Sequence, residues 1–307
     1  MILNQPLLEL YSKKGCGLCN FLVEASCFDL FLSLFSFSSR VEELPILFMD
    51  GIFRCSRYAF GPNRLHYCGP DANKTMKEYL DAGESDPGLS AILRKFQNLY
   101  PYLSHIAEGN DIRDPFDDAV VEAYWIGNRL LDTFSPKQYL GLLDDLEVKK
   151  KTGRERFETL GRKVMHGGFP HHSFHVLNVW RETNHELLHD GDWSAVAECI
   201  VSWGKVSAVS GPFIDVVTEP LLRDEREKFF LGAPVSRRLV RDLAADIDID
   251  LLAPEQWISI HWGVPCEVLS ESAALRLRNY TLRSITLAND SPSNIQRNSH
   301  LFTIVNK

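Results

Sequence analysis

Apolar side chains recur at three- and four-residue steps through the middle of the chain, which is the spacing of helices that bury one face. This pattern predicts amphipathic helices over residues 87–108, 117–134 and 136–147. Ser135 and Pro136 at the start of the third segment predict an N-cap followed by a first-turn proline. The basic run KKKTGRER, residues 149–156, predicts a solvated connector after these helices.

The pattern changes to alternation in the C-terminal third, where strands are expected. Residues 205–222 alternate between apolar and polar neighbours, and Gly211 and Pro212 suit a turn between two short strands. Residues 257–262, WISIHW, predict a third strand, and residues 271–289 predict a further helix. The expected fold class is therefore α+β, predominantly α-helical with a small antiparallel sheet in the C-terminal third.

Changes in composition along the chain predict three parts. Residues 1–50 are rich in Phe, Leu and Ser and form an N-terminal extension, residues 51–289 form a single α-rich globular domain, and residues 290–307 form a flexible tail. Nowhere does the sequence reach about 18 consecutive apolar residues, so it predicts no membrane-spanning helix.

The charge and the cysteines narrow the possible partners and location. Acidic residues outnumber Lys and Arg by 41 to 33, and the net charge is −8, which argues against nucleic acid and anionic membranes as partners. Seven widely spaced cysteines do not resemble the disulfide framework of a small secreted protein, which favours a cytoplasmic location. The sequence lacks a GxSxG elbow, a GxxxxGK[ST] loop and a GxGxxG turn, so triad hydrolysis and nucleotide binding gain no support.

Six of the ten histidines lie within residues 166–189. If the segment after Pro170 is one helix, steps of four and three place on one stripe His171, His175, Asn178, Glu182, His185 and His189. Two imidazoles at i and i+4 can bind one metal ion. The stripe spans about 27 Å, so its two histidine pairs would serve separate sites. The alternative is a set of histidines whose hydrogen bonds go to backbone carbonyls.

Metal ligands usually come from more than one element, so we look for partners elsewhere in the chain. The candidate metal ligands are His171, His172 and His175 at the centre, with His66, Cys68, His261 and Cys266 from other segments. His261 ends a predicted strand and Cys266 follows a turn with Gly263 and Pro265, so the alternative for this pair is a capped corner.

The segment RYAFGPNRLHYCGP, residues 57–70, contains two glycines and two prolines, which predicts a rigid, turn-rich loop. Rigid polar loops suit binding because their donors are ordered before the ligand arrives. Arg57 and Asn63, with Asn178 from the His-rich segment, are the candidate residues for binding a small molecule. The alternative is a structural clamp between the N-terminal residues and the helical body.

A CxxC motif, Cys16 to Cys19, ends the N-terminal run LLELYSKKGCGLC. This run resembles the first strand and active-site turn of glutaredoxin-like proteins, which implies a redox role for Cys16 and Cys19. The 25 residues between Cys19 and Pro45 are too few for the rest of that fold before its proline-to-strand passage, so the resemblance is to a truncated segment. A CxxC motif also serves metal binding.

Five motifs from residue 57 onward together resemble an uncharacterised prokaryotic family of unknown function: RYAFGPNRLHYCGP, FPHHSFHVLNVWRET, VSAVSGPFIDVVTEPL, WISIHWGVPCEVL and LRNYTLRSITLAN. The set covers residues 57–289. The resemblance implies an association with nickel–iron hydrogenase and maturation genes, and therefore an accessory role with hydrogenase or maturation proteins as partners.

The sequence thus favours a cytoplasmic accessory protein that binds a transition metal or a metallo-enzyme partner. Imidazole and thiolate suit Zn, Ni and Fe, and the sequence does not choose among them. Two alternatives stay open. One is an enzyme that holds a small molecule between residues 57–70 and the His-rich helix and uses a histidine as general acid or base. The other is a non-catalytic interaction protein.

Overall fold

A computed structural model of the chain describes residues 50–183, 193–241 and 251–290. All of them belong to one compact unit, Met49–Lys307. The predicted N-terminal extension and C-terminal tail lie outside the described residues, apart from Asp50 and Asp290 where the two expected boundaries fall. So do four residues that the sequence singled out: Cys16, Cys19, His185 and His189.

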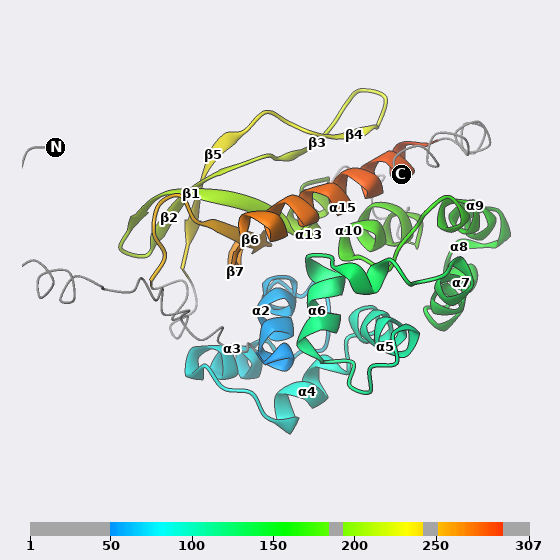
Figure 1. The fold of residues 1–307 in the computed structure, drawn as a ribbon, viewed down its shortest axis with the longest axis horizontal. Helices are drawn as coiled ribbons and strands as arrows, with labels where there is room; N and C mark the ends of the chain where they lie inside the picture. Colours follow the sequence, from blue (N-terminus) through cyan, green and yellow to red (C-terminus); the bar gives the residue numbers. More distant parts are fainter. Residues whose placement is uncertain (1–49, 184–192, 242–250, 291–307) are drawn as a thin grey trace, which may run out of the picture. The chain divides into compact units, whose positions relative to one another are not determined.

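The described chain begins with a helical body (Figure 1). Its elements are α2 (Gly51–Arg64), α3 (Asn73–Ala82), α4 (Pro87–Leu93), α5 (Leu99–Gly109), α6 (Asp118–Trp125), the short helix η2 (Arg129–Leu131), α7 (Pro136–Asp145), α8 (Val148–Thr152), α9 (Arg154–Met165), α10 (His172–Phe174), the π-helix η3 (His175–Trp180), α11 (Arg181–Thr183) and α13 (Trp193–Cys199). The predicted start of α7 is confirmed, because Ser135 and Gln138 form a reciprocal capping box ahead of Pro136.

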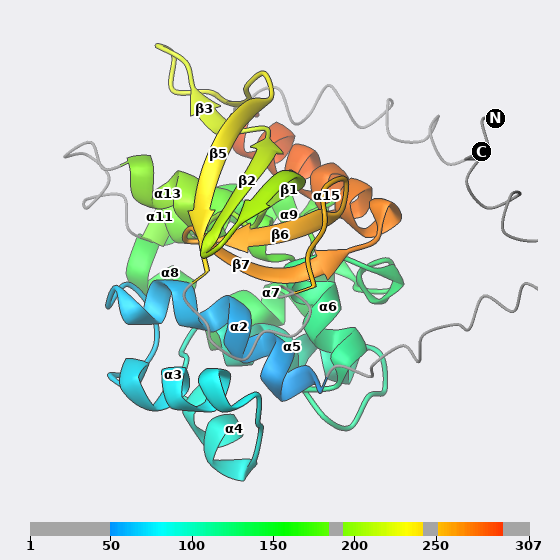
Figure 2. The ribbon, with the colours of Figure 1, turned by 90° about the vertical axis from the view of Figure 1, so that its left-hand side faces the viewer.

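A five-stranded antiparallel sheet follows, in the order β5-β2-β1-β6-β7 (Figure 2). Its strands are β1 (Ser202–Ser210), β2 (Phe213–Thr218), β5 (Val235–Val240), β6 (Trp257–His261) and β7 (Val264–Leu269), and a separate hairpin pairs β3 (Leu221–Arg223) with β4 (Phe229–Leu231). The α+β class and the antiparallel sheet in the C-terminal part of the chain are therefore confirmed.

Two tight turns fix the register of this sheet. Ser210 pairs with Phe213 across the predicted turn, where Gly211 adopts a φ of 57°. His261 pairs with Val264 across the other turn. There both central residues have positive φ, 52° at Trp262 and 71° at Gly263, as a two-residue hairpin of type I′ requires. This second turn fixes the position of His261 at the end of β6.

Helix α15 (Glu271–Asn289) joins the sheet to the helical body. Its bounds match the sequence prediction, and the Ser270 hydroxyl caps its first turn by accepting from the Ala273 N–H at 3.1 Å. The helix contacts β1, β6 and β7 on one side and α10 and η3 on another (Figure 1). It therefore holds the His-rich segment close to the sheet.

Two of the predicted helices are shorter than the periodicity suggested. The segment 87–108 divides into α4 and α5, because residues 94–98 leave the helical path between them. The segment 117–134 ends its first helix at Trp125, where Gly127 follows with a φ of 91°. A side chain at Gly127 would overlap the ring of Tyr280, so the chain turns there against α15. Amphipathic spacing alone did not show these breaks.

Two predicted loops are helical. The basic run 149–156 lies mostly within α8 and α9, and Gly153, with a φ of 78°, forms the break between them. Residues 57–64 of the predicted turn-rich loop belong to α2, which contains Pro62. Gly61 serves close packing and not a turn. A Cβ at this position would lie 2.8 Å from the carbonyl oxygen of His261, so the glycine lets α2 approach the end of β6. The turns begin only at Leu65.

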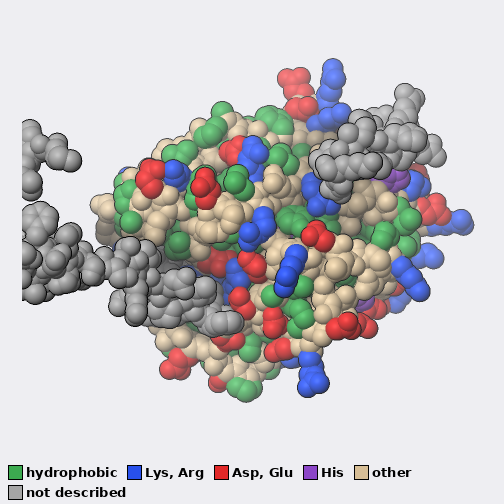
Figure 3. All heavy atoms as spheres, viewed as in Figure 1, with side chains coloured by type: hydrophobic (Ala, Val, Ile, Leu, Met, Phe, Trp, Pro, Cys, Tyr) green, Lys and Arg blue, Asp and Glu red, His purple; other side chains and the backbone are tan. Residues whose placement is uncertain are grey.

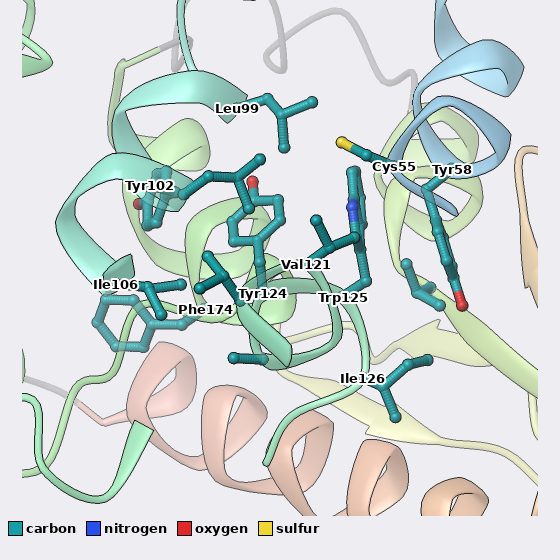
Figure 4. Close-up of a cluster of buried hydrophobic side chains, with 14 of the residues drawn as sticks. Cys55, Tyr58, Leu99, Tyr102, Ile106, Val121, Tyr124, Trp125, Ile126 and Phe174 are labelled. Carbon is teal, nitrogen blue, oxygen red and sulfur yellow. The ribbon is translucent and has the colours of Figure 1, made fainter. Parts of the chain in front are cut away.

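The core is rich in aromatic rings between α2, α5 and α6 (Figure 4). Tyr58 and Trp125 stack at 5.0 Å between ring centroids, and Tyr102 and Tyr124 lie 5.1 Å apart. All four side chains are buried. This packing fixes the wall against which the His-rich segment lies.

Basic and acidic side chains are interspersed over the face drawn in Figure 3, with apolar side chains between them. Among the described residues, no helix is both long enough and apolar enough to cross a membrane.

Candidate functional site

The His-rich segment is not the single regular helix that the spacing predicted. His171 is the N-cap of α10, and its Nδ1 accepts from the Ser173 N–H at 3.1 Å. After one turn of α-helix the chain continues as a π-helix from His175 to Trp180. A π-helical turn holds more residues than an α-helical turn, so the predicted stripe loses its register. His171 instead stacks on Tyr280 of α15, with centroids 5.1 Å apart and planes at 14°.

A cavity opens beside this segment, with about 670 Å³ of space between atoms including its mouth. Its walls come from α2 and the loop after it, α5 and the residues before it, α6, α10, η3, α13 and the β6–β7 turn. The lining residues are Ala59, Pro62, Tyr67, Cys68, Phe96, Asn98, Leu99, Tyr124, Trp125, His172, His175, Trp180, Ala195, Cys199, His261 and Trp262. Four predicted metal ligands therefore share one cavity: His172, His175, His261 and Cys68.

His172 begins α10 and has partners at both ring nitrogens. Its Nδ1 lies 3.1 Å from the hydroxyl oxygen of Tyr124, and its Nε2 lies 2.7 Å from the carbonyl oxygen of Cys199. A neutral ring satisfies both when Nε2–H donates to the carbonyl and the tyrosine hydroxyl donates to Nδ1. The rings of Trp125 and His261 lie 4.5 and 5.1 Å from it, which fixes its plane.

His261 ends β6 and faces two carbonyl oxygens. Its Nδ1 lies 2.7 Å from the carbonyl oxygen of Tyr58, and its Nε2 lies 3.1 Å from that of Cys199. A neutral imidazole has one N–H, so it can donate to only one of the two carbonyls. The shorter contact assigns the proton to Nδ1, which leaves the Nε2 lone pair facing the Cys199 carbonyl.

Cys199, the last residue of α13, completes a cluster of three. Its Sγ lies 3.9 Å from Nε2 of His172, and the possible ligand atoms of His172, Cys199 and His261 all lie within 4.8 Å of one another. Burial, with a smaller contribution from the nearby Cys68 thiol, raises the pKa of Cys199 to about 12. Without a cation beside it, this sulfur is therefore a thiol at neutral pH.

Burial also decides the protonation of the histidines that line the cavity. Desolvation lowers the pKa of His261 to about 4 and that of His175 to about 3. For His172 the pKa falls well below its ordinary value, first through burial and then through its neighbours His261 and His175. All three rings are consequently neutral at pH 7, and each has one unprotonated ring nitrogen. His175 differs from the other two in its position, with Nδ1 3.1 Å from the hydroxyl of Tyr102.

Three predicted metal ligands lie elsewhere. His171 is buried against Tyr280 and does not line the cavity. His66 lies just after α2 with 67% of its side chain exposed, 3.9 Å from a carboxylate oxygen of Asp71. Cys266 is fully buried in β7, and its Sγ contacts the carbonyl oxygens of Val264 and Arg57 at 3.4 and 3.8 Å.

The three predicted small-molecule contacts have structural partners, and the cavity lining does not include them. Asn63 donates from Nδ2 to the carbonyl oxygens of Cys68 and Pro70, which holds the loop that carries Cys68. Asn178 accepts from the Lys163 ammonium at 3.0 Å and donates to the Ser284 carbonyl oxygen. Arg57 is buried with its guanidinium 6.0 Å from the ring centre of Phe53.

A buried ionic network stands behind His261. The Arg54 guanidinium contacts the Glu267 carboxylate at 2.9 Å, and the Tyr58 hydroxyl donates to the same carboxylate oxygen. Ser259, two residues before His261, lies 2.7 Å from that hydroxyl. These contacts fix Tyr58, whose carbonyl oxygen holds Nδ1 of His261.

Sequence reasoning did not find Cys199, Tyr124 or Trp125. Cys199 belongs to no spaced motif and directly precedes the residues that lead into β1. Tyr124 and Trp125 lie on the buried side of α6, within the segment 117–134, whose apolar spacing indicates packing and not a site. One signal in the sequence could have pointed to Tyr124 and Cys199. A hydroxyl or thiol in a segment that is expected to be buried needs a polar partner, and the nearby histidines could supply one.

Comparisons with known proteins yield one match. A model described as a family of unknown function (DUF6390) matches residues 48–294, which confirms the expectation of an uncharacterised family. No curated protein and no solved structure matches the chain.

Proposed function

The chain belongs to DUF6390, a family of unknown function, and from its site we propose that the protein binds one transition-metal ion. The ligands in this proposal are Nε2 of His172, Nε2 of His261 and Sγ of Cys199. To bind through Nε2, His172 must take its other tautomer, in which Nδ1–H donates to the hydroxyl oxygen of Tyr124. This set keeps two of the histidines that the sequence proposed and replaces their distant partners with a cysteine from α13.

The observation that carries the proposal is the position of His261. Its ring has one proton for two carbonyl oxygens, at 2.7 and 3.1 Å. A lone pair that faces a carbonyl oxygen is unfavourable, and a cation bound at Nε2 would use that lone pair. The Nδ1–H bond to a main-chain carbonyl is also the usual way in which a protein orients a metal-binding imidazole.

The chemistry of the three groups supports a transition metal rather than Ca²⁺ or Mg²⁺, which prefer oxygen ligands. Two imidazoles and one thiolate suit Zn, Ni and Fe. Ligand atoms around a tetrahedral ion lie roughly 3.5 Å apart, so a separation of up to 4.8 Å requires a small closure of the site. A bound cation would also favour the thiolate form of Cys199.

Metal analysis of the full chain, purified without a tag, tests this proposal. We expect about one transition-metal ion per chain and, after Co²⁺ substitution, a thiolate-to-cobalt absorption band. Cys199→Ser should lose the band and most of the metal. The matched control is Cys266→Ser, which changes another buried cysteine and should keep both. Substoichiometric metal in the wild type, or equal metal in Cys199→Ser and wild type, would overturn the proposal.

The accessory role is a proposal about where this ion is used. The motif resemblance supports nickel–iron hydrogenase or maturation proteins as partners, and two imidazoles with a thiolate are compatible with nickel. Affinity purification of the tagged full chain from its own cells should recover hydrogenase or maturation subunits. Recovery of the chain alone under mild conditions would contradict this role while leaving metal binding untouched.

The cavity itself favours a second candidate, an enzyme that acts on a small molecule beside α2 and the His-rich segment. Pro62 and Ala59 of α2 and His175 of η3 all line the space that such a molecule would fill. His175 would be the general base of such an enzyme. Burial lowers its pKa to about 3, and so weak a base is poorly matched to proton transfer at neutral pH, which counts against this candidate.

A further inference from the structure

The cavity walls carry an unusual set of side chains. Lys, Arg, Asp and Glu are absent from the described residues that line it. Aromatic rings predominate instead: Tyr67, Phe96, Tyr124, Trp125, Trp180 and Trp262. A site for a phosphate, a carboxylate or an ammonium group would need a charged partner, since burying an unpaired charge is costly.

The polar groups of the cavity are few and lie together. His172, His261 and Cys199 form one cluster, and the ring of His175 lies 6.3 Å from that of His172. Pockets that bind small organic molecules have this composition, an apolar wall with a few convergent polar atoms that set the orientation.

The turn between β6 and β7 positions one of the aromatic walls. Trp262 adopts a φ of 52°, which an aromatic residue rarely does, and its ring packs on Tyr67 with centroids 4.4 Å apart. The two rings come from the β6–β7 turn and from the loop after α2, and together they line the cavity. A backbone conformation of this kind persists only where the surrounding structure holds it.

We propose that this cavity binds a small, uncharged aromatic molecule with its single lone-pair atom directed at the His172–His261–Cys199 cluster. An aromatic ring that packs on the aromatic walls is stabilised by more than the burial of its apolar area alone. Three protein ligands leave one position of a tetrahedral ion open for the lone-pair atom. Only this last contact rests on the proposed metal function.

Three probes of similar size separate the parts of the proposal. The probe 4-methylpyridine carries a ring and a lone pair, toluene carries the ring alone, and benzoate carries the ring with a charge. Calorimetric titration of the metal-loaded full chain at pH 8 should give the tightest binding for 4-methylpyridine, with toluene at least about tenfold weaker. Benzoate should not bind the metal-free chain, where its carboxylate has no charged partner. Binding of benzoate to the metal-free chain as tight as that of toluene would overturn the proposal.

One residue allows the cavity to be filled without changing a ligand. Ala195 lies on α13 four residues before Cys199, so the two side chains share a face of the helix, and both line the cavity. Ala195→Phe should weaken 4-methylpyridine and toluene binding at least about tenfold and leave the metal content unchanged. The matched control is Ser194→Phe, which adds the same ring at an exposed position of the same helix. Equal binding by both variants would contradict the proposal.

The wild-type protein supplies a test that needs no variant, should Ala195→Phe fail to fold. Toluene should compete with 4-methylpyridine for the full chain, because both rings occupy the same walls. In the metal-free protein the two probes should bind with similar affinity. If metal analysis finds no ion, competition between these probes still supports the cavity while the metal function fails. A chain that holds stoichiometric metal but binds neither probe overturns this inference alone.

Discussion

The imidazoles of His172 and His261 direct their Nε2 atoms at one acceptor, the carbonyl oxygen of Cys199, at 2.7 and 3.1 Å. The rings come from α10 and from the end of β6, and the acceptor comes from the end of α13. On the far side of each ring, Nδ1 has its own partner, the Tyr124 hydroxyl or the Tyr58 carbonyl. The core thus sets the direction in which both Nε2 atoms point.

The role of the Tyr124 hydroxyl in orienting His172 can be tested by mutation. Tyr124→Phe removes the partner of His172 Nδ1 and keeps the ring, so we expect metal affinity to fall by about 10-fold. Competition with a chelator of known affinity measures the change. Tyr139→Phe is the matched control, because it removes another buried hydroxyl, one that contacts Tyr102 at 3.2 Å and does not line the cavity. Equal affinity of the two variants would show that Tyr124 does not orient the ligand.

The sequence predicted the parts of the fold whose pattern is local. Helix α15, the β1–β2 hairpin and β6 have clear periods bounded by turn residues or an N-cap. The breaks at Arg94–Asn98 and Gly127 depend on packing against other elements, such as the approach of Gly127 to Tyr280, and no local pattern shows that. Residues 57–64 are helical for a similar reason, because Gly61 and its neighbours in α2 pack closely against the β6–β7 turn.

For the candidate site, the sequence predicted several of the residues but not how they are grouped in space. The sequence proposed His172, His175, His261 and Cys68, all of which line the cavity. It grouped them with residues that regular helical spacing favours, and the π-helix that begins at His175 breaks that spacing. Cys199 reaches the histidines only because α13 ends beside the His261 turn, a tertiary relation marked by the Trp262 N–H bond to the Glu198 carbonyl oxygen at 3.0 Å.

Gly61 offers a test of the packing that positions His261. An added Cβ would lie 2.8 Å from the carbonyl oxygen of His261 and 2.9 Å from Cβ of Trp262, and the first of these is backbone that cannot rotate away. We expect Gly61→Ala to lower the free energy of unfolding by about 1–3 kcal/mol and to weaken metal binding. Urea denaturation measures the first effect and metal titration the second.

The control for this change is Gly161→Ala. Gly161 lies within α9, and an added Cβ there would meet only Leu140 at 3.8 Å, an ordinary contact. Alanine favours a helix over glycine, so this variant should match the wild type or gain up to about 1 kcal/mol. A stable Gly61→Ala protein with full metal affinity would mean that α2 and the β6–β7 turn do not constrain each other.

A buried lysine gives the fold a pH dependence separate from the proposed metal site. Lys163 donates to Asn178 at 3.0 Å, and its pKa falls from 10.5 to about 8, chiefly through burial. Arg181 lowers this pKa further, while Glu182 and Asp290 oppose the shift. In the unfolded chain the ammonium keeps a pKa near its ordinary value, so the unfolded state binds more protons between pH 8 and 10.5.

Stability should therefore rise with pH across this window. Below pH 8 the lysine is charged in both states and the cost of burying it is fully present. Above pH 10.5 it is neutral in both states and that cost is gone. The shift corresponds to about 3 kcal/mol. Lys163→Met keeps the length of the side chain without the charge, so its stability advantage over wild type should shrink by that amount between pH 8 and 10.5 in urea denaturation. Parallel pH curves for the two proteins would show that Lys163 is not buried as a charged group.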